Sequence, residues 1–144
     1  MSTQKPIIVD TNILFSALLN NKSSFAEILI GSDYRFFVCE LVLVELFKRK
    51  EKLVKVSLLS EDEIVRIYQI LLKRITLYKE DLIALDYRAV AYALCKDIDE
   101  SDTPHVALTL ELDGSLWTGD KKLKEGLRRK GFNQFFEPNS LWDT

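Results

Sequence analysis

The fold of this chain is constrained most by one stretch near its start, Ile7-Ile8-Val9-Asp10-Thr11-Asn12. Its first three residues are apolar and β-branched, and the run is too short for a helix. Polar residues flank the run on both sides, which is typical of a short buried strand in a parallel sheet. Asp10 stands directly after this strand, where the ligand crevice of an open parallel sheet lies. The stretch therefore predicts a central strand with an acidic residue at its carboxyl end.

Strand-like and helix-like patterns alternate along the rest of the chain. The clearest helix start is Ser60, because Ser60-Glu61-Asp62-Glu63 has the capping-box spacing and acids in its first turn. The alternation predicts an α/β fold in which helices cover both faces of a parallel sheet. We expect further strands at 35–38, 75–78, 116–118 and 134–136, and helices at 13–19, 25–30, 40–52, 60–74, 83–96, 103–112 and 121–130.

The chain has 144 residues, 47% of them hydrophobic and 29% charged, which is typical of one ordinary globular domain. We therefore expect a single domain over residues 1–144. The two cysteines, Cys39 and Cys95, belong to no paired motif, so we expect buried free thiols rather than disulfides or a zinc site. The polar start does not fit a signal peptide, and no apolar run approaches the roughly 18 residues that span a bilayer. We expect a cytoplasmic protein with no membrane partner.

Four acidic residues stand where the predicted sheet would expose a ligand site. Asp10 follows the first strand, and Asp120 follows Leu116-Trp117-Thr118 after one glycine. Asp102 precedes the helix at 103–112, and Glu45 interrupts an apolar run. Each acid also has a simpler explanation, since aspartate is a good helix N-cap and Glu45 can pair with Arg49 one turn later. If the four converge, their mutual repulsion requires cations.

Oxygen ligands without neighbouring histidine or cysteine favour hard cations such as Mg²⁺ or Mn²⁺ over zinc and copper. The sole histidine, His105, cannot supply a histidine-based site. We expect it at the surface, and the alternative is that it approaches the substrate from a position near Asp102. Magnesium held by a few carboxylates usually meets substrate phosphates, where it can orient a water and stabilise the leaving oxygen. Phosphodiester hydrolysis is the reaction that this set of residues fits.

The acids lie within short motifs that resemble those of PIN domains, in the same order and with similar spacing. The resemblance extends over about residues 7–125, nearly the whole chain. The motifs are Val9-Asp10-Thr11-Asn12, Val44-Glu45-Leu46, Asp99-Glu100-Ser101-Asp102 with Val106-Ala107-Leu108, and Trp117-Thr118-Gly119-Asp120.

This resemblance implies a metal-dependent ribonuclease on a Rossmann-like, three-layer α/β/α sandwich. It implies that the acids Asp10, Glu45, Asp102 and Asp120 bind the metal and act in catalysis. Many small bacterial PIN proteins are toxins of toxin–antitoxin pairs and are often dimers, so a separate antitoxin chain and a homodimer are also implied. Four further residues match supporting positions of the family and are expected to be accessory: Thr11, Asn12, Asp99 and Thr118.

Basic residues gather after two of the proposed acids, although the chain as a whole has a net charge of −2. These two basic runs can contact RNA phosphates, or they can simply be solvated helix faces. The first basic run comprises Lys48, Arg49, Lys50, Lys52 and Lys55, and the second comprises Lys121, Lys122, Lys124, Arg128, Arg129 and Lys130.

Two other classes of function remain open at this point. Aspartyl-phosphate phosphatases and receiver domains also place an aspartate after the first strand, but such phosphatases generally have a second aspartate where this chain has Asn12. A non-catalytic module that binds RNA or a protein on the same sheet is the other class. It differs from a nuclease because it would retain RNA affinity after its acids were replaced.

Overall fold

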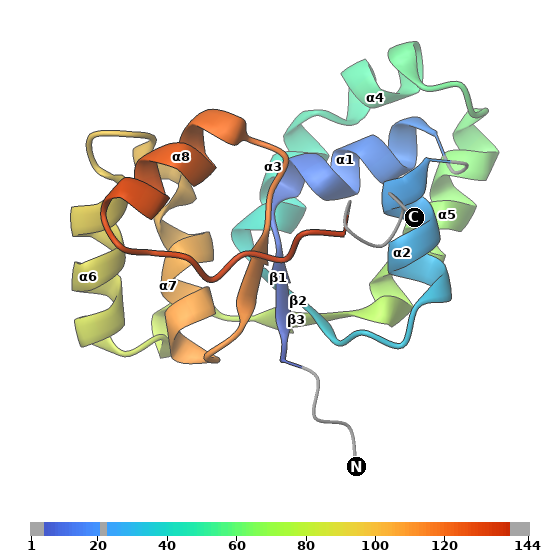
Figure 1. The fold of residues 1–144 in the computed structure, drawn as a ribbon. Helices are drawn as coiled ribbons and strands as arrows, with labels where there is room; N and C mark the ends of the chain where they lie inside the picture. Colours follow the sequence, from blue (N-terminus) through green and yellow to red (C-terminus); the bar gives the residue numbers. More distant parts are fainter. Residues whose placement is uncertain (1–4, 21–22, 139–144) are drawn as a thin grey trace.

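Four short parallel strands form the centre of the molecule (Figure 1). The computed structural model describes residues 5–20 and 23–138. The strand order is β3-β2-β1-β4. The strand β1 is central, since its residue Ile8 pairs with Phe37 of β2 on one side and with Leu116 of β4 on the other. The strands are β1 (Ile7–Val9), β2 (Phe36–Cys39), β3 (Ile75–Tyr78) and β4 (Ser115–Trp117).

Helices cover both faces of this sheet, as the alternating pattern predicted. Helices α1, α2 and α5 lie on one face, and α6, α7 and α8 lie on the other (Figure 1). The α-helices are α1 (Thr11–Leu19), α2 (Ser24–Gly31), α3 (Leu41–Lys48), α4 (Lys50–Val56), α5 (Glu61–Arg74), α6 (Leu85–Cys95), α7 (Thr103–Glu111) and α8 (Lys121–Arg129), and the 3₁₀ helices are η1 (Glu80–Leu82) and η2 (Glu100–Asp102).

The period-two alternation of the strands divides the apolar core into two clusters. Ile7, Val9 and Trp117 pack into the cluster under α1, α2 and α5, whereas Ile8 and Leu116 pack into the cluster under α6, α7 and α8. Two core clusters separated by one parallel sheet make a three-layer α/β/α sandwich, so the predicted fold class is confirmed.

Local signals in the sequence account for several element boundaries. The backbone N–H of Glu63 donates to Ser60 Oγ at 3.2 Å, and the N–H of Ser60 donates back to Glu63 Oε1 at 3.0 Å. The predicted capping box therefore starts α5. Cys39 and Cys95 are buried free thiols, as expected.

Two expectations about the elements are wrong. The helix expected at 40–52 is broken at Arg49, which separates α3 from α4 with φ −96° and ψ 6°. The break allows Leu53 to enter the core while the Arg49 side chain reaches α1. The strand expected at 134–136 is reduced to one parallel bridge between Leu116 and Phe135. Two backbone hydrogen bonds, both made by Leu116, hold this segment beside β4.

The chain has no candidate for a membrane span within residues 5–20 and 23–138, where every helix falls short of the required length and apolarity.

Candidate active site

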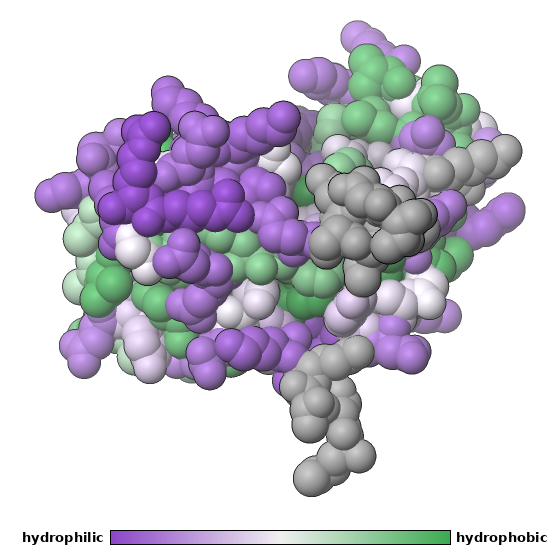
Figure 2. All heavy atoms as spheres, viewed as in Figure 1, coloured by the Kyte–Doolittle hydropathy of each residue, from purple (hydrophilic) through white to green (hydrophobic). Residues whose placement is uncertain are grey.

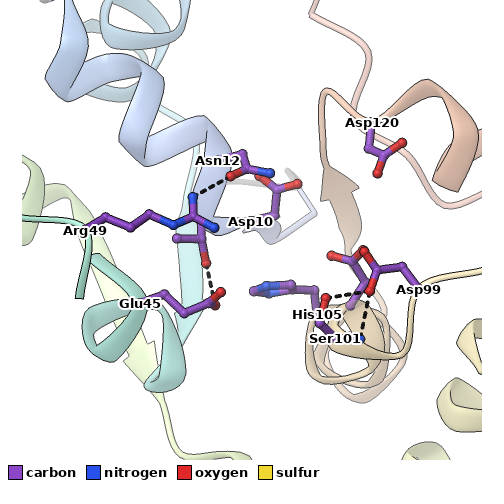
Figure 3. A pocket seen from close by; sticks show the side chains of 10 residues that line it. Asp10, Asn12, Glu45, Arg49, Asp99, Ser101, His105 and Asp120 are labelled. Atoms are coloured by element: carbon purple, nitrogen blue, oxygen red, sulfur yellow. Dashed lines mark hydrogen bonds between the residues drawn. The ribbon is translucent and has the colours of Figure 1, made fainter. Parts of the chain in front are cut away.

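A pocket of about 140 Å³ lies at the carboxyl ends of β1 and β4 (Figure 3). Two of its acids come from the turns after these strands: Asp10 follows β1, and Asp120 follows β4 after two residues. All four predicted acids lie in this pocket. The residues that line it are Asp10, Thr11, Asn12, Glu45, Arg49, Asp99, Ser101, Asp102, His105 and Asp120.

Asp10 both caps a helix and faces the pocket. Its Oδ1 accepts a hydrogen bond from the backbone N–H of Ile13 at 3.0 Å, at the start of α1. The side chain is 5% exposed, and this burial raises the pKa of the Asp10 carboxyl, while hydrogen bonds from Thr118 and Ile13 oppose the increase. Asp10 can therefore cap α1 and line the pocket at the same time.

Asp120 has the same double position at the start of α8. Its Oδ1 accepts from the backbone N–H of Leu123 at 3.1 Å, and its own N–H donates to Thr118 Oγ1 at 3.2 Å. Thr118 thus contacts both strand-end acids.

Asp102 differs from these two because its carboxylate makes no capping hydrogen bond to α7. Burial raises its pKa to about 7, and the negative charges of Asp99, Asp10, Asp120 and Glu45 contribute to this increase in that order. Capping therefore does not explain Asp102. Its carboxyl group lies where four other acids repel its charge.

Glu45 is oriented by a threonine rather than by an arginine. Its Oε1 accepts a hydrogen bond from Thr11 Oγ1 at 2.8 Å, across the interface between α3 and α1. Arg49 instead donates from Nη1 to Asn12 Oδ1 at 2.9 Å. The pairing of Glu45 with Arg49 was the simpler explanation for this glutamate, and the structure replaces it with two separate contacts to α1.

Asp99 forms a cluster of carboxylates with two of the four predicted acids. Asp99, Asp102 and Asp120 each offer a carboxylate oxygen within 4.8 Å of the other two. Asp99 Oδ1 accepts from the backbone N–H of Ser101 at 3.0 Å and from its hydroxyl at 2.6 Å. Both residues stand within the motif Asp99-Glu100-Ser101-Asp102, which predicted a role for Asp99 but did not single out Ser101.

The expectation of a surface position for His105 is wrong. The residue is 3% exposed and lies in the pocket wall, on the buried side of α7. Burial lowers the pKa of its imidazole to about 4, so the ring is neutral at pH 7. Its Nδ1 is buried without a hydrogen-bond partner among the described residues. This position agrees with the alternative, a histidine near Asp102. The sequence did not favour that alternative because α7 buries five consecutive residues, 105–109, and so has no single apolar side that would indicate it.

The donor set fits a hard divalent cation. The pocket offers five carboxylates, three of them oriented by hydroxyl groups, and its one imidazole is buried beside them. Mg²⁺ and Mn²⁺ prefer such oxygen ligands, and a cation would relieve the repulsion that adds to burial in raising the pKa of Asp102.

Comparison with solved structures finds the same fold in a protein with a very different sequence. A chain in the crystal structure of VapBC2 from Rickettsia felis, bound to a DNA fragment from their promoter, superimposes with a TM-score of 0.62 and 17% identity. The match covers 83% of this chain and 92% of that chain. None of the curated proteins matches the sequence.

Comparison with protein families gives a match to the PIN domain over residues 8–135. The match includes β1 through β4 and every acid of the pocket. The chain therefore belongs to the PIN domain family.

Proposed function

We propose that this chain is a metal-dependent endoribonuclease that hydrolyses RNA phosphodiester bonds at the acidic pocket. PIN domains are generally nucleases, which supports the class of reaction. The observation that carries the proposal is the convergence of five carboxylates in one pocket, where Asp99, Asp102 and Asp120 each offer an oxygen within 4.8 Å of the other two. Such a set of acids is costly unless a cation occupies it, and carboxylates that hold a divalent cation typically act on phosphate esters.

Asp10, Glu45, Asp102 and Asp120 would hold one or two Mg²⁺ or Mn²⁺ ions, with Asp99 beside them. When bound, the cation supplies the positive charge that polarises the phosphodiester and stabilises the oxygen that leaves.

Hydrogen bonds from the surrounding side chains orient these carboxylates before substrate binds. Thr11 holds Glu45, Thr118 donates to Asp10, and Ser101 holds Asp99. Preorganised carboxylates need no rearrangement during the reaction, so the transition state is stabilised more than the bound substrate. Thr11 and Thr118 are accessory in this sense, whereas Asn12 is accessory through its hydrogen bond to Arg49 and Asp99 as a further carboxylate beside the ligands.

The surfaces beside the pocket suit a polyanion such as RNA. The first basic run continues from α3 into α4, and the second occupies α8, where hydrophilic side chains gather on the surface (Figure 2). Most of these residues are exposed, although Lys124 and Arg128 pair with Glu137 and Lys130 pairs with Asp97. Exposed basic side chains next to a cluster of carboxylates bring phosphates toward it.

Cleavage of a mixed set of structured and single-stranded RNAs tests the proposal. The purified chain should cut RNA with Mg²⁺ or Mn²⁺, and EDTA, Asp10→Asn and Asp102→Asn should each reduce the rate by at least about 100-fold. Asp33→Asn is the matched control, because Asp33 is exposed and precedes β2 at the opposite end of the sheet. Full activity of Asp102→Asn would refute the assignment of the site. RNA affinity without cleavage, unaffected by both variants, would instead support a binding module.

We further propose that the chain forms a homodimer and acts as the toxin of a toxin–antitoxin pair, with the antitoxin as a separate chain. The similarity to a chain of VapBC2 supports this assignment. An apolar cavity of about 460 Å³ between α3, α4 and α5 offers a surface for a protein, and Phe47 at its edge is 77% exposed.

Induced expression should stop bacterial growth with the native chain and not with Asp102→Asn. Equal growth of the two strains would refute the toxin assignment. Light scattering tests the homodimer and should give twice the mass of one chain.

A further inference from the structure

Arg49 contributes a positive charge to a pocket that is otherwise acidic. Among the described residues that line this pocket, Arg49 is the one that is cationic at pH 7, because burial keeps His105 neutral. It lies at the break between α3 and α4, and its side chain reaches the pocket from the side opposite to Asp120 (Figure 3). The sequence places Arg49 within the first basic run, but its position separates it from the exposed lysines of that run.

The guanidinium is held in place without pairing with a carboxylate. Nη1 donates to the neutral amide oxygen of Asn12 at 2.9 Å, and the guanidinium carbon lies 5.6 Å from the centroid of the Phe15 ring. None of the ion pairs in residues 5–20 and 23–138 includes Arg49. An arginine that served to neutralise the pocket acids would pair with them. This arginine is instead fixed by an amide and an aromatic face, which leave its charge available to another anion.

We propose that Arg49 anchors a phosphate of the RNA backbone adjacent to the one that is cleaved. The inference rests on the proposed nuclease function and identifies the residue that sets the position of the strand in the pocket. A guanidinium has five N–H donors in a planar fork, and the bond to Asn12 uses one of them. The remaining donors suit two oxygens of one phosphate. A phosphate held by Arg49 places the next phosphate across the pocket, toward Asp99, Asp102 and Asp120.

The test combines variants of Arg49 with RNAs in which a single linkage is an uncharged methylphosphonate. Arg49→Gln removes the charge, and Arg49→Lys retains it without the fork. Arg66→Gln is the matched control, because Arg66 is an exposed arginine outside both basic runs. KM and kcat are measured with Mg²⁺, and binding of the same RNAs is measured by fluorescence anisotropy in EDTA. Thermal unfolding shows whether each variant is folded.

With unmodified RNA we expect Arg49→Gln to raise KM and the dissociation constant roughly 10- to 100-fold, with a smaller effect on kcat. Arg49→Lys should recover part of the affinity, and Arg66→Gln should change either value less than about 3-fold. At the linkage that Arg49 contacts, the methylphosphonate should weaken binding by the native chain as much as Arg49→Gln does. The same methylphosphonate should not weaken binding by Arg49→Gln any further.

The proposal would be overturned if, at every linkage, the methylphosphonate weakened binding by Arg49→Gln as much as it weakens binding by the native chain. It would also be overturned if Arg49→Gln had the KM and the dissociation constant of the native chain. A purely structural role for Arg49 predicts the first of these outcomes, because a defect in packing does not depend on the charge of one phosphate. The binding measurement decides the question even if no RNA is cut. Absence of cleavage by the native chain would refute the nuclease proposal, whereas cleavage without coupling to one linkage would refute the anchor alone.

Discussion

The raised pKa of Asp102 makes the stability of the metal-free protein depend on pH. The pKa of its carboxyl is about 7 in the native state, against 3.8 for an ordinary aspartate. Between pH 4 and pH 7 the native state therefore holds a proton that the unfolded chain has released. The contribution of Asp102 to the free energy of unfolding falls as pH rises through this window. His105 acts in the opposite sense below pH 6.5, because its pKa is lowered to about 4.

Asp102→Asn isolates the effect of the one carboxyl, since His105 is common to both proteins. We expect the variant to be more stable than the native chain in EDTA by about 1–3 kcal/mol at pH 8, with the difference shrinking toward zero near pH 4. Urea unfolding at several pH values measures it, and Asp33→Asn should show no such trend. Saturating Mg²⁺ should stabilise the native chain more than the variant. A stability difference that is constant with pH would contradict this account.

The N-termini of α1 and α8 show how one residue can serve an element and a site together. Asp120 caps α8 through Leu123, and asparagine caps a helix as well as aspartate does. We expect Asp120→Asn to unfold within about 0.5 kcal/mol of the native chain, whereas Asp120→Ala should be less stable by about 1 kcal/mol. Both variants should be unable to cleave RNA, because neither supplies a charged ligand. If Asp120→Asn still cleaved RNA, the role of Asp120 would be limited to capping α8.

Arg74 joins the end of α5 to the segment between α2 and β2. Its guanidinium donates to three backbone carbonyls, those of Leu29, Ser32 and Tyr34, at 2.5–3.3 Å, and lies over the ring of Phe36. Arg74→Met leaves these carbonyls without their donor, and we expect the free energy of unfolding to fall by about 2–4 kcal/mol.

Chemical denaturation of Arg74→Met measures this decrease. Lys73→Met is the control, because Lys73 is the exposed neighbour in the same helical turn and should change stability by less than about 0.5 kcal/mol. Equal decreases in the two variants would show that the hydrogen bonds of Arg74 contribute little.

Elements with a strong local signal could be predicted from the sequence, and elements set by tertiary contacts could not. The strand Ile7–Val9 and the helix that begins after Ser60 match their predicted positions because a short β-branched run and a capping box act locally. The break at Arg49 depends on Asn12 and Phe15, which are 37 and 34 positions away in sequence. The buried position of His105 likewise depends on which side of α7 meets the sheet, and an apolar helix does not indicate that side.

At the scale of the whole molecule, charge is separated between the acidic pocket and the basic surfaces beside it. The net charge of −2 conceals this separation, which is why composition alone neither favoured nor excluded nucleic acid. The predicted acids Asp10, Glu45, Asp102 and Asp120 do converge, because residues that follow parallel strands meet at one edge of the sheet. The neighbours of each acid, such as Thr11 beside Glu45, required the three-dimensional arrangement.

This separation predicts how RNA binding depends on salt. Replacement of Lys121, Lys122 and Arg129 by glutamine removes three exposed charges from α8. If each of these side chains neutralises one phosphate, the plot of log affinity against log salt concentration should become shallower by about 0.7 per side chain replaced, or roughly 2 in all. Arg66, Lys79 and Lys96 are exposed outside both basic runs, and their replacement by glutamine serves as the control. The two triple variants have the same net charge, so an equal change of slope in both would mean that RNA responds to overall charge rather than to the surface of α8.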